Sequence, residues 1–179
     1  MSRNDYIKRL VLLSALTGLI IIISYVESFI PFFIPGMKIG FANIIILLII
    51  YNFNLLDGIL VTIIKVFIVS LLKGNIFTMG FFMSLSGSLL SFFLMFLLYK
   101  FVKKIGRVTI SILGSVTHTV SQILIALIYL ETSAIFYYLP ILLLIAIPSG
   151  GVIGYLSILI NKPLSKISFL QKKEIESQK

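Results

Sequence analysis

The sequence predicts an all-α integral membrane protein that crosses the bilayer six times. The chain has 179 residues, 59% of them hydrophobic, and its mean hydropathy is +1.15. Apolar runs of about 20 residues recur along it, and a helix of that length crosses the ~30 Å of bilayer hydrocarbon. We therefore expect a single transmembrane domain over residues 1–179, with polar ends at residues 1–9 and 162–179.

The first two predicted spans differ in length. Leu10–Val26 is uncharged and ends at Glu27, and it lacks the Ala-x-Ala pattern of a cleaved signal peptide, so we expect it to stay in the mature protein. Phe41–Phe53 is apolar but only about 20 Å long as a helix. It crosses fully only if the turn before it also enters the membrane.

Four further apolar segments complete the predicted bundle. The last of them contains two prolines, which we expect to break its helix. These four segments are Gly58–Leu72, Ile76–Tyr99, Val108–Leu130 and the span within Thr132–Ile160, where the prolines are Pro140 and Pro148.

The connection Pro31–Asn43 contains two prolines, two glycines and Lys38. Proline lacks a backbone donor and glycine opens turn conformations, so one continuous helix is excluded here. Irregular backbone persists in a bilayer only where protein or a water-filled cavity satisfies its polar groups. Two interpretations stay open: the connection lines a binding mouth, or it is an interfacial loop whose Lys38 touches lipid headgroups.

The basic residues predict the orientation of the chain. Cytoplasmic flanks of membrane proteins are enriched in lysine and arginine, and six spans put both termini on the cytoplasmic side. Of the 15 basic residues, only Lys38, Lys65 and Lys73 then fall elsewhere. The others are Arg3, Lys8, Arg9, Lys100, Lys103, Lys104, Arg107, Lys162, Lys166, Lys172, Lys173 and Lys179.

Lys65 interrupts an apolar span, where a charge costs at least ~2.5 kcal/mol on insertion scales. It lies eight residues after Asp57, about 12 Å along a helix, which is a long reach for its ammonium group to the interface. We therefore expect it to face the bundle interior. A ligand or partner is one expected contact, and a structural pairing with Glu27 or Asn43 is the alternative.

His118 and Gln122 lie in another apolar span. They share one helical stripe with Ser111 and Ser115, and we expect this polar face to point inward. His118 then either contacts a ligand or handles protons, or it is bonded to a neighbouring helix.

Composition excludes several classes of function. The chain has no cysteine and only two aspartates, Asp5 and Asp57, so thiolate sites and the carboxylate clusters that hold Mg²⁺ for diphosphate chemistry are missing. Walker A and Rossmann glycine patterns are also missing. We expect no enzyme, catalytic residue, metal or cofactor, and we read the +9 charge as topology rather than nucleic-acid binding.

Small residues spaced four apart mark faces where helices approach closely. They are found at Ser14-x-x-x-Gly18, at Ser84, Gly87, Ser88 and Ser91, and at Gly150-x-x-x-Gly154. Packing within the chain explains any one of these motifs. Because there are three of them, one could instead contact a partner protein.

The chain resembles the Gx transporter family, often labelled heptaprenyl diphosphate synthase component I. The likeness runs from about Leu10 to Ile160. It rests on Ile-Pro-x-x-x-Pro-Gly-Met-Lys-Ile-Gly-x-Ala-Asn from Ile30, the Asp57-Gly58 turn, Lys65, Ser-Leu-Ser-Gly-Ser from Ser84, and His118-x-x-x-Gln122. More distantly, the chain is similar to the six-helix S components of energy-coupling-factor (ECF) transporters.

The resemblance implies a plasma-membrane subunit that binds a small or amphipathic molecule from the outer side for uptake. A coupling subunit and ATPases would supply the energy, docking at Ser14 and Gly18, where the family usually has alanines. The implied binding residues are Lys38, Asn43, Lys65, His118 and Gln122. Positive charge there favours a ligand with an acidic or phosphate group.

Two other functions stay open. The first is a non-catalytic membrane accessory that recruits a prenyl diphosphate synthase subunit or quinone and redox machinery. The second is a purely structural subunit, in which leucine would replace Lys65 without loss of function.

Overall fold

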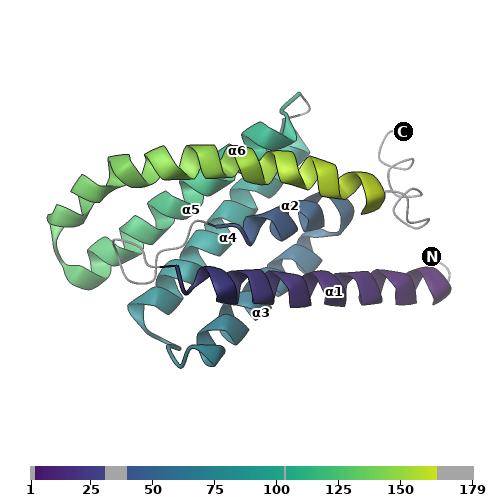
Figure 1. Cartoon of the computed structure of the whole chain (residues 1–179), viewed down its shortest axis with the longest axis horizontal. Coiled ribbons are helices and arrows are strands. Elements are labelled where there is room, and N and C mark those ends of the chain that lie inside the picture. The colour runs from purple at the N-terminus through teal and green to yellow at the C-terminus, as the bar shows by residue number, and fades with distance from the viewer. Residues whose placement is uncertain (1–2, 31–39, 103, 165–179) are drawn as a thin grey trace.

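The computed structural model describes residues 3–30, 40–102 and 104–164, which form a bundle of helices (Figure 1). In chain order the elements are α1 (Arg3–Glu27), α2 (Asn43–Asn52), α3 (Leu55–Leu72), α4 (Met79–Phe101), α5 (Arg107–Leu130), the 3₁₀ helix η1 (Ser133–Tyr138) and α6 (Leu139–Leu164).

The predicted all-helical membrane fold is confirmed. Five stretches of the described residues are long and apolar enough to cross a membrane: α1, α3, α4, α5, and η1 together with α6. The second predicted span is the exception in length, because α2 has 10 residues, about 15 Å of helix. Phe41–Phe53 therefore crosses the bilayer only together with other parts of the chain.

α2 lies inside the bundle rather than on its surface. It contacts α1, α3, α4, α5 and α6. Every residue from Ile45 to Ile50 is buried, so the helix has no face for lipid or water. A helix that is apolar all round suits such a central position, because each of its sides meets another helix.

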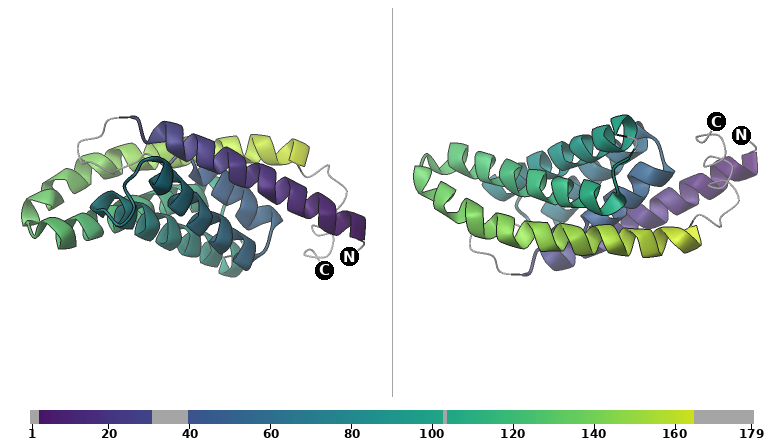
Figure 2. Two further views of the ribbon diagram at one scale, coloured as in Figure 1. Left: turned by 90° about the horizontal axis from the view of Figure 1, so that it is seen from below. Right: turned by 90° about the horizontal axis from the view of Figure 1, so that it is seen from above.

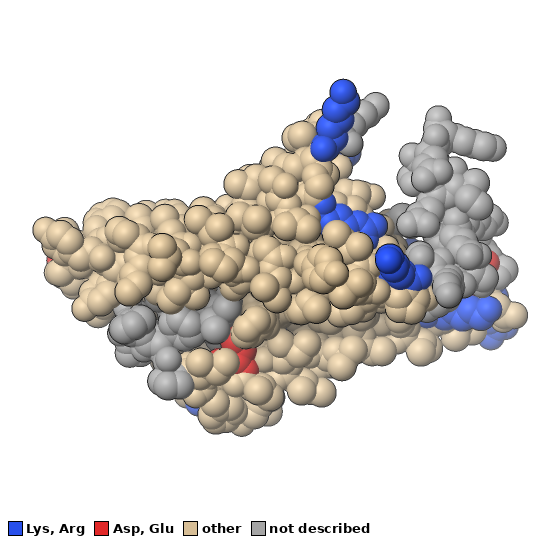
Figure 3. Space-filling model, turned by 45° about the horizontal axis from the view of Figure 1, so that its top comes forward, with Lys and Arg blue, Asp and Glu red and all other residues tan. Residues whose placement is uncertain are grey.

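The start of α1 and the end of α6 lie toward the same end of the molecule (Figure 1). The hairpin of α5 and α6 projects beyond the other helices at the opposite end (Figures 1 and 2). Basic side chains gather toward the end where α1 starts and α6 ends, and most of the face drawn in Figure 3 carries no charge. We call this the basic end, and its described basic residues are Arg3, Lys8, Arg9, Lys100, Lys104, Arg107 and Lys162.

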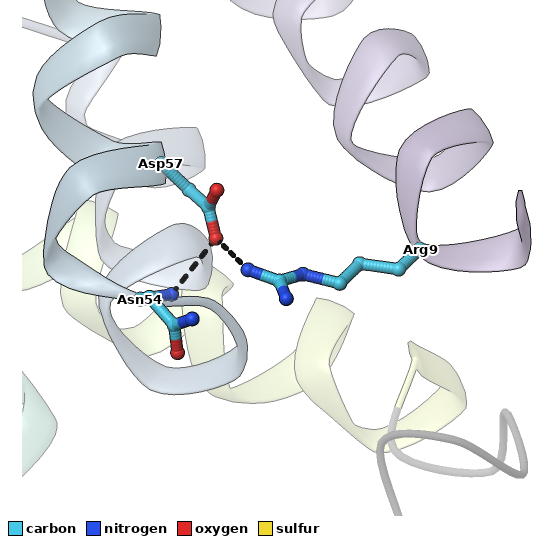
Figure 4. A network of polar contacts seen from close by, with 3 residues as sticks. All are labelled: Arg9, Asn54 and Asp57. Atoms are coloured by element: carbon cyan, nitrogen blue, oxygen red, sulfur yellow. Dashed lines mark hydrogen bonds and ion pairs between the residues drawn. The ribbon is translucent and has the colours of Figure 1, made fainter. Parts of the chain in front are cut away.

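An ion pair ties α1 to α3 near the basic end (Figure 4). Arg9 Nη2 donates to Asp57 Oδ2, and the same carboxylate oxygen accepts the backbone N–H of Asn54 at 3.1 Å. Asp57 therefore caps the start of α3 while it binds α1.

A second polar cluster at the basic end joins three helices. Asn161 on α6 lies between two donors, Nδ2 of Asn52 on α2 and the guanidinium of Arg107 on α5. In one orientation its Oδ1 accepts from Asn52 Nδ2 at 2.7 Å. In the flipped orientation it accepts from Arg107 Nη1 and Nη2 at 2.9 and 3.2 Å. The guanidinium also lies over the Tyr51 ring, 3.9 Å from its centroid.

Small residues bring α4, α5 and α6 into close contact. A Cβ on Gly150 would lie 2.8 Å from the Cα of Ile112, and one on Gly154 would lie 2.7 Å from the Cα of Val108. Ser91 Oγ on α4 donates to the carbonyl of Gly114 on α5 at 2.8 Å. The Gly150-x-x-x-Gly154 motif therefore packs within the chain.

One expectation about α6 is wrong. The prolines do not break the helix, which runs from Leu139 to Leu164 with Pro148 inside it. Pro140 lies at the second helical position, where a missing N–H costs nothing. Proline within a transmembrane helix is tolerated because neighbouring groups satisfy the released carbonyl.

Candidate functional site

A small cavity lies among the helices, and most of the residues that line it have polar side chains. Its volume is about 10 Å³, close to the space of one water molecule. Lining residues come from each of the helices α1 to α5 and from the turn before α2. The lining residues are Ser24, Glu27, Gly40, Ala42, Asn43, Lys65, Ser84, Ser88 and His118.

Lys65 reaches the cavity from the middle of α3. Its side chain is buried, with 3% of the residue exposed, so the prediction that it faces the bundle interior is confirmed. Its Nζ donates to the Oγ of Ser88 on α4 at 2.9 Å. An ammonium group in an apolar bundle is stable only when polar groups replace its water, and the serine supplies one such group.

Glu27 reaches the same cavity from the last residue of α1, and it too is 3% exposed. Its Oε1 accepts the backbone N–H of Gly40 and, at 3.1 Å, that of Phe41. These two amides lie just before α2, where a helix end leaves backbone donors without intrahelical partners. Gly40 has a φ of +95°, a conformation that suits glycine, and so allows the chain to turn into α2 beside the carboxylate.

Asn43 opens α2 next to this turn. Its backbone N–H donates to the Gly40 carbonyl at 2.8 Å, and its Nδ2 lies 3.1 Å from the position of a Cβ on Gly40. This Nδ2 is buried and donates to no acceptor among the described residues. The cavity therefore has a carboxylate and an amide donor at one backbone turn.

His118 and Gln122 lie on the inward face of α5, as predicted, and both are buried. Gly87 on α4 makes room for them, because a Cβ there would lie 3.0 Å from His118 Cε1 and Nδ1 and 3.1 Å from Gln122 Cγ. His118 lines the cavity, whereas Gln122 lies one helical turn further along α5 and does not.

The structure thus brings together three of the five predicted binding residues: Asn43, Lys65 and His118. Gln122 is their buried neighbour, and Lys38 lies outside the described residues. The two predicted docking residues are elsewhere. Ser14 and Gly18 are exposed on α1, and no atom lies within 4 Å of the position of a Cβ on Gly18.

Sequence reasoning missed several lining residues. Glu27 was named only as the end of a predicted span and as a structural partner of Lys65. Ser84 and Ser88 were assigned to helix packing. A signal did exist for the serines: Ser84 and Ser88 are four apart on one face of a helix, and such a face also presents hydroxyls to a buried ammonium.

Comparisons with known proteins give one family. The sequence model of the family described as Heptaprenyl diphosphate synthase component I matches residues 16–160. This range includes the described cavity residues and all of α2 to α5. No curated protein and no solved structure gives a significant match.

Proposed function

The chain belongs to the heptaprenyl diphosphate synthase component I family, and from the cavity within its helices we propose that it is a substrate-binding membrane subunit. In this proposal the subunit resembles an ECF-type S component. It binds a small or amphipathic molecule from the outer side and hands it to a separate energising module for uptake. We propose that the protein lies in the plasma membrane and that its basic end faces the cytoplasm.

The observation that carries the proposal is the convergence of buried polar groups. Glu27, Lys65 and His118 come from three helices and line one cavity inside an apolar bundle. Ionisable groups in transmembrane helices are costly, and they commonly mark substrate or ion pathways. We assign binding roles to Lys38, Asn43, Lys65, His118 and Gln122. Since the cavity holds about one water molecule, a larger ligand requires the helices to separate.

The exposed face of α1 supports a partner subunit. The Gly150 motif is used within the chain, but Ser14 and Gly18 leave an open surface that a second helix can approach. We propose that the coupling subunit docks there. Gly18→Leu should then abolish co-purification of a coupling subunit and its ATPases, and it should leave ligand binding unchanged.

Native mass spectrometry of the purified chain tests the binding role. Lys65→Ala and His118→Ala should each lose small molecules that co-purify with the wild type. Lys73→Ala is the matched control, because Lys73 is an exposed lysine at the end of the same helix. If both cavity variants retain every molecule of the wild type, the assigned site is wrong.

A second candidate function follows from the family description, which names a synthase component. In this alternative the chain is a non-catalytic membrane accessory of a prenyl synthase subunit or of redox machinery. A pull-down separates the two functions. Recovery of ATPases with a coupling subunit supports uptake, whereas recovery of a soluble prenyl synthase supports the accessory.

A further inference from the structure

The described lining of the cavity carries two opposite charges. Glu27 contributes a carboxylate from α1 and Lys65 contributes an ammonium group from α3. The remaining lining residues are serines, Gly40, Ala42, Asn43 and His118. With His118 neutral, the formal charges of this lining sum to zero. A lysine alone would favour an anionic ligand, but the carboxylate beside the same cavity opposes one.

Glu27 retains capacity to bind a ligand. Both of its hydrogen bonds, from the amides of Gly40 and Phe41, go to Oε1. Within the described ranges, Oε2 accepts no hydrogen bond. A carboxylate oxygen accepts N–H donors and cations, so Glu27 offers the cavity an acceptor with negative charge.

The cavity also has two hydrogen-bond donors, the Asn43 amide beside the Gly40 turn and the Lys65 ammonium group on α3. Asn43 Nδ2 is buried and has no acceptor among the described residues, and it lies beside the Gly40 turn that binds Glu27. Lys65 adds an ammonium group that donates a hydrogen bond to Ser88. The site therefore presents an anionic acceptor next to an amide donor and a cation.

We infer that the ligand of this cavity is a small zwitterion, on the scale of an amino acid. Its cationic group binds Glu27, and its anionic group binds Asn43 and Lys65. A simple anion such as phosphate satisfies Lys65 but brings its charge close to Glu27, and a simple cation has the converse problem. This inference rests on the proposed binding function and narrows it to one class of ligand.

Three probes with one carbon skeleton test the inference: 4-aminobutyrate, butyrate and butylamine. Their dissociation constants are measured with the full chain in lipid nanodiscs. We expect the wild type to bind the zwitterion about ten- to a hundred-fold more tightly than either singly charged probe, the range that one charge-assisted hydrogen bond supplies.

Two variants should change this preference in opposite directions. Glu27→Gln keeps an oxygen for the Gly40 and Phe41 amides, removes the charge, and should shift the preference toward butyrate. Lys65→Met should shift it toward butylamine, and it tests the inference independently if Glu27→Gln does not fold. Glu131→Gln is the control, because Glu131 is exposed at the end of α5, and it should behave as the wild type.

The outcomes of these experiments distinguish a failure of the zwitterion inference from a failure of the proposed ligand-binding function. Tighter binding of butyrate or inorganic phosphate than of 4-aminobutyrate, unchanged in Glu27→Gln, overturns the zwitterion and leaves ligand binding intact. The same conclusion follows if no probe binds while native mass spectrometry still finds a co-purified molecule. If no probe binds and no molecule co-purifies, both the inference and the proposed function are wrong.

Discussion

Lys65 on α3 and Ser88 on α4 are joined by a buried hydrogen bond of 2.9 Å between Nζ and Oγ. The bond links two helices at the depth of the cavity, so it contributes both to stability and to the position of the ammonium group. Replacing Ser88 perturbs the structure less than replacing Lys65, because the lysine charge stays in place.

Ser88→Ala should lower the free energy of unfolding by about 1–3 kcal/mol, since a buried ammonium loses an acceptor. Ser86→Ala on the same helix is the control. The Ser86 hydroxyl donates only within its own helix, to the Met83 carbonyl at 3.3 Å, and its loss should cost less than about 0.5 kcal/mol. Unfolding in detergent with added SDS measures both, and equal effects would contradict the structural role of this bond.

Two glycine-to-alanine changes should separate internal packing from an open helix face. At Gly150 a methyl group collides with the Ile112 backbone, so Gly150→Ala should destabilise by about 1–3 kcal/mol. At Gly18 nothing lies within 4 Å, and alanine favours helix more than glycine does, so Gly18→Ala should be neutral or stabilise by up to about 1 kcal/mol. Thermal unfolding of the purified variants gives the comparison.

Asn161→Asp should stabilise the basic end. An amide has one oxygen for two neighbouring donors, Asn52 Nδ2 and the Arg107 guanidinium, whereas a carboxylate has two oxygens. We expect a gain of about 1 kcal/mol at neutral pH after the desolvation cost of the new charge. Asn161→Leu, which satisfies neither donor, should destabilise instead. A loss of stability in Asn161→Asp would show that Arg107 is satisfied without this side chain.

The orientation of the bundle can be tested by labelling introduced cysteines, because the chain contains none of its own. Arg3→Cys lies at the basic end, and Tyr137→Cys lies in η1, where Tyr137 is 87% exposed. In intact cells a membrane-impermeant maleimide should label Tyr137→Cys and spare Arg3→Cys until the membrane is opened. The reverse pattern would mean that the basic end faces outward, against the positive-inside rule.

Much of the fold could be predicted from the sequence because the membrane imposes a simple length rule on apolar helices. Lys65 and His118 were identified as inward-facing for the same reason, since ionisable groups inside such helices avoid lipid. The position of Glu27 in the cavity was not predicted, because a carboxylate at the end of a span fits an interfacial position equally well. Its role depends on where the chain returns at Gly40 and Phe41, which periodicity does not encode.

The central position of α2 also escaped prediction. Its uniformly apolar sequence fits a lipid-facing helix as well as a buried one, and only its shortness hinted at the difference. Pro148 led to the wrong prediction of a broken helix. Proline breaks helices in water-soluble proteins, but it is tolerated in a transmembrane helix that packs against neighbouring helices.

The enclosure of α2 by five other helices bears on how the protein is made. An apolar helix of only 10 residues is too short to hold a transmembrane position by itself during biosynthesis. Its stable environment is complete only once α6, the last of the described helices in chain order, closes over it. A chain truncated before α6 should therefore leave α2 uncovered and be degraded, even though most of its spans have already been inserted.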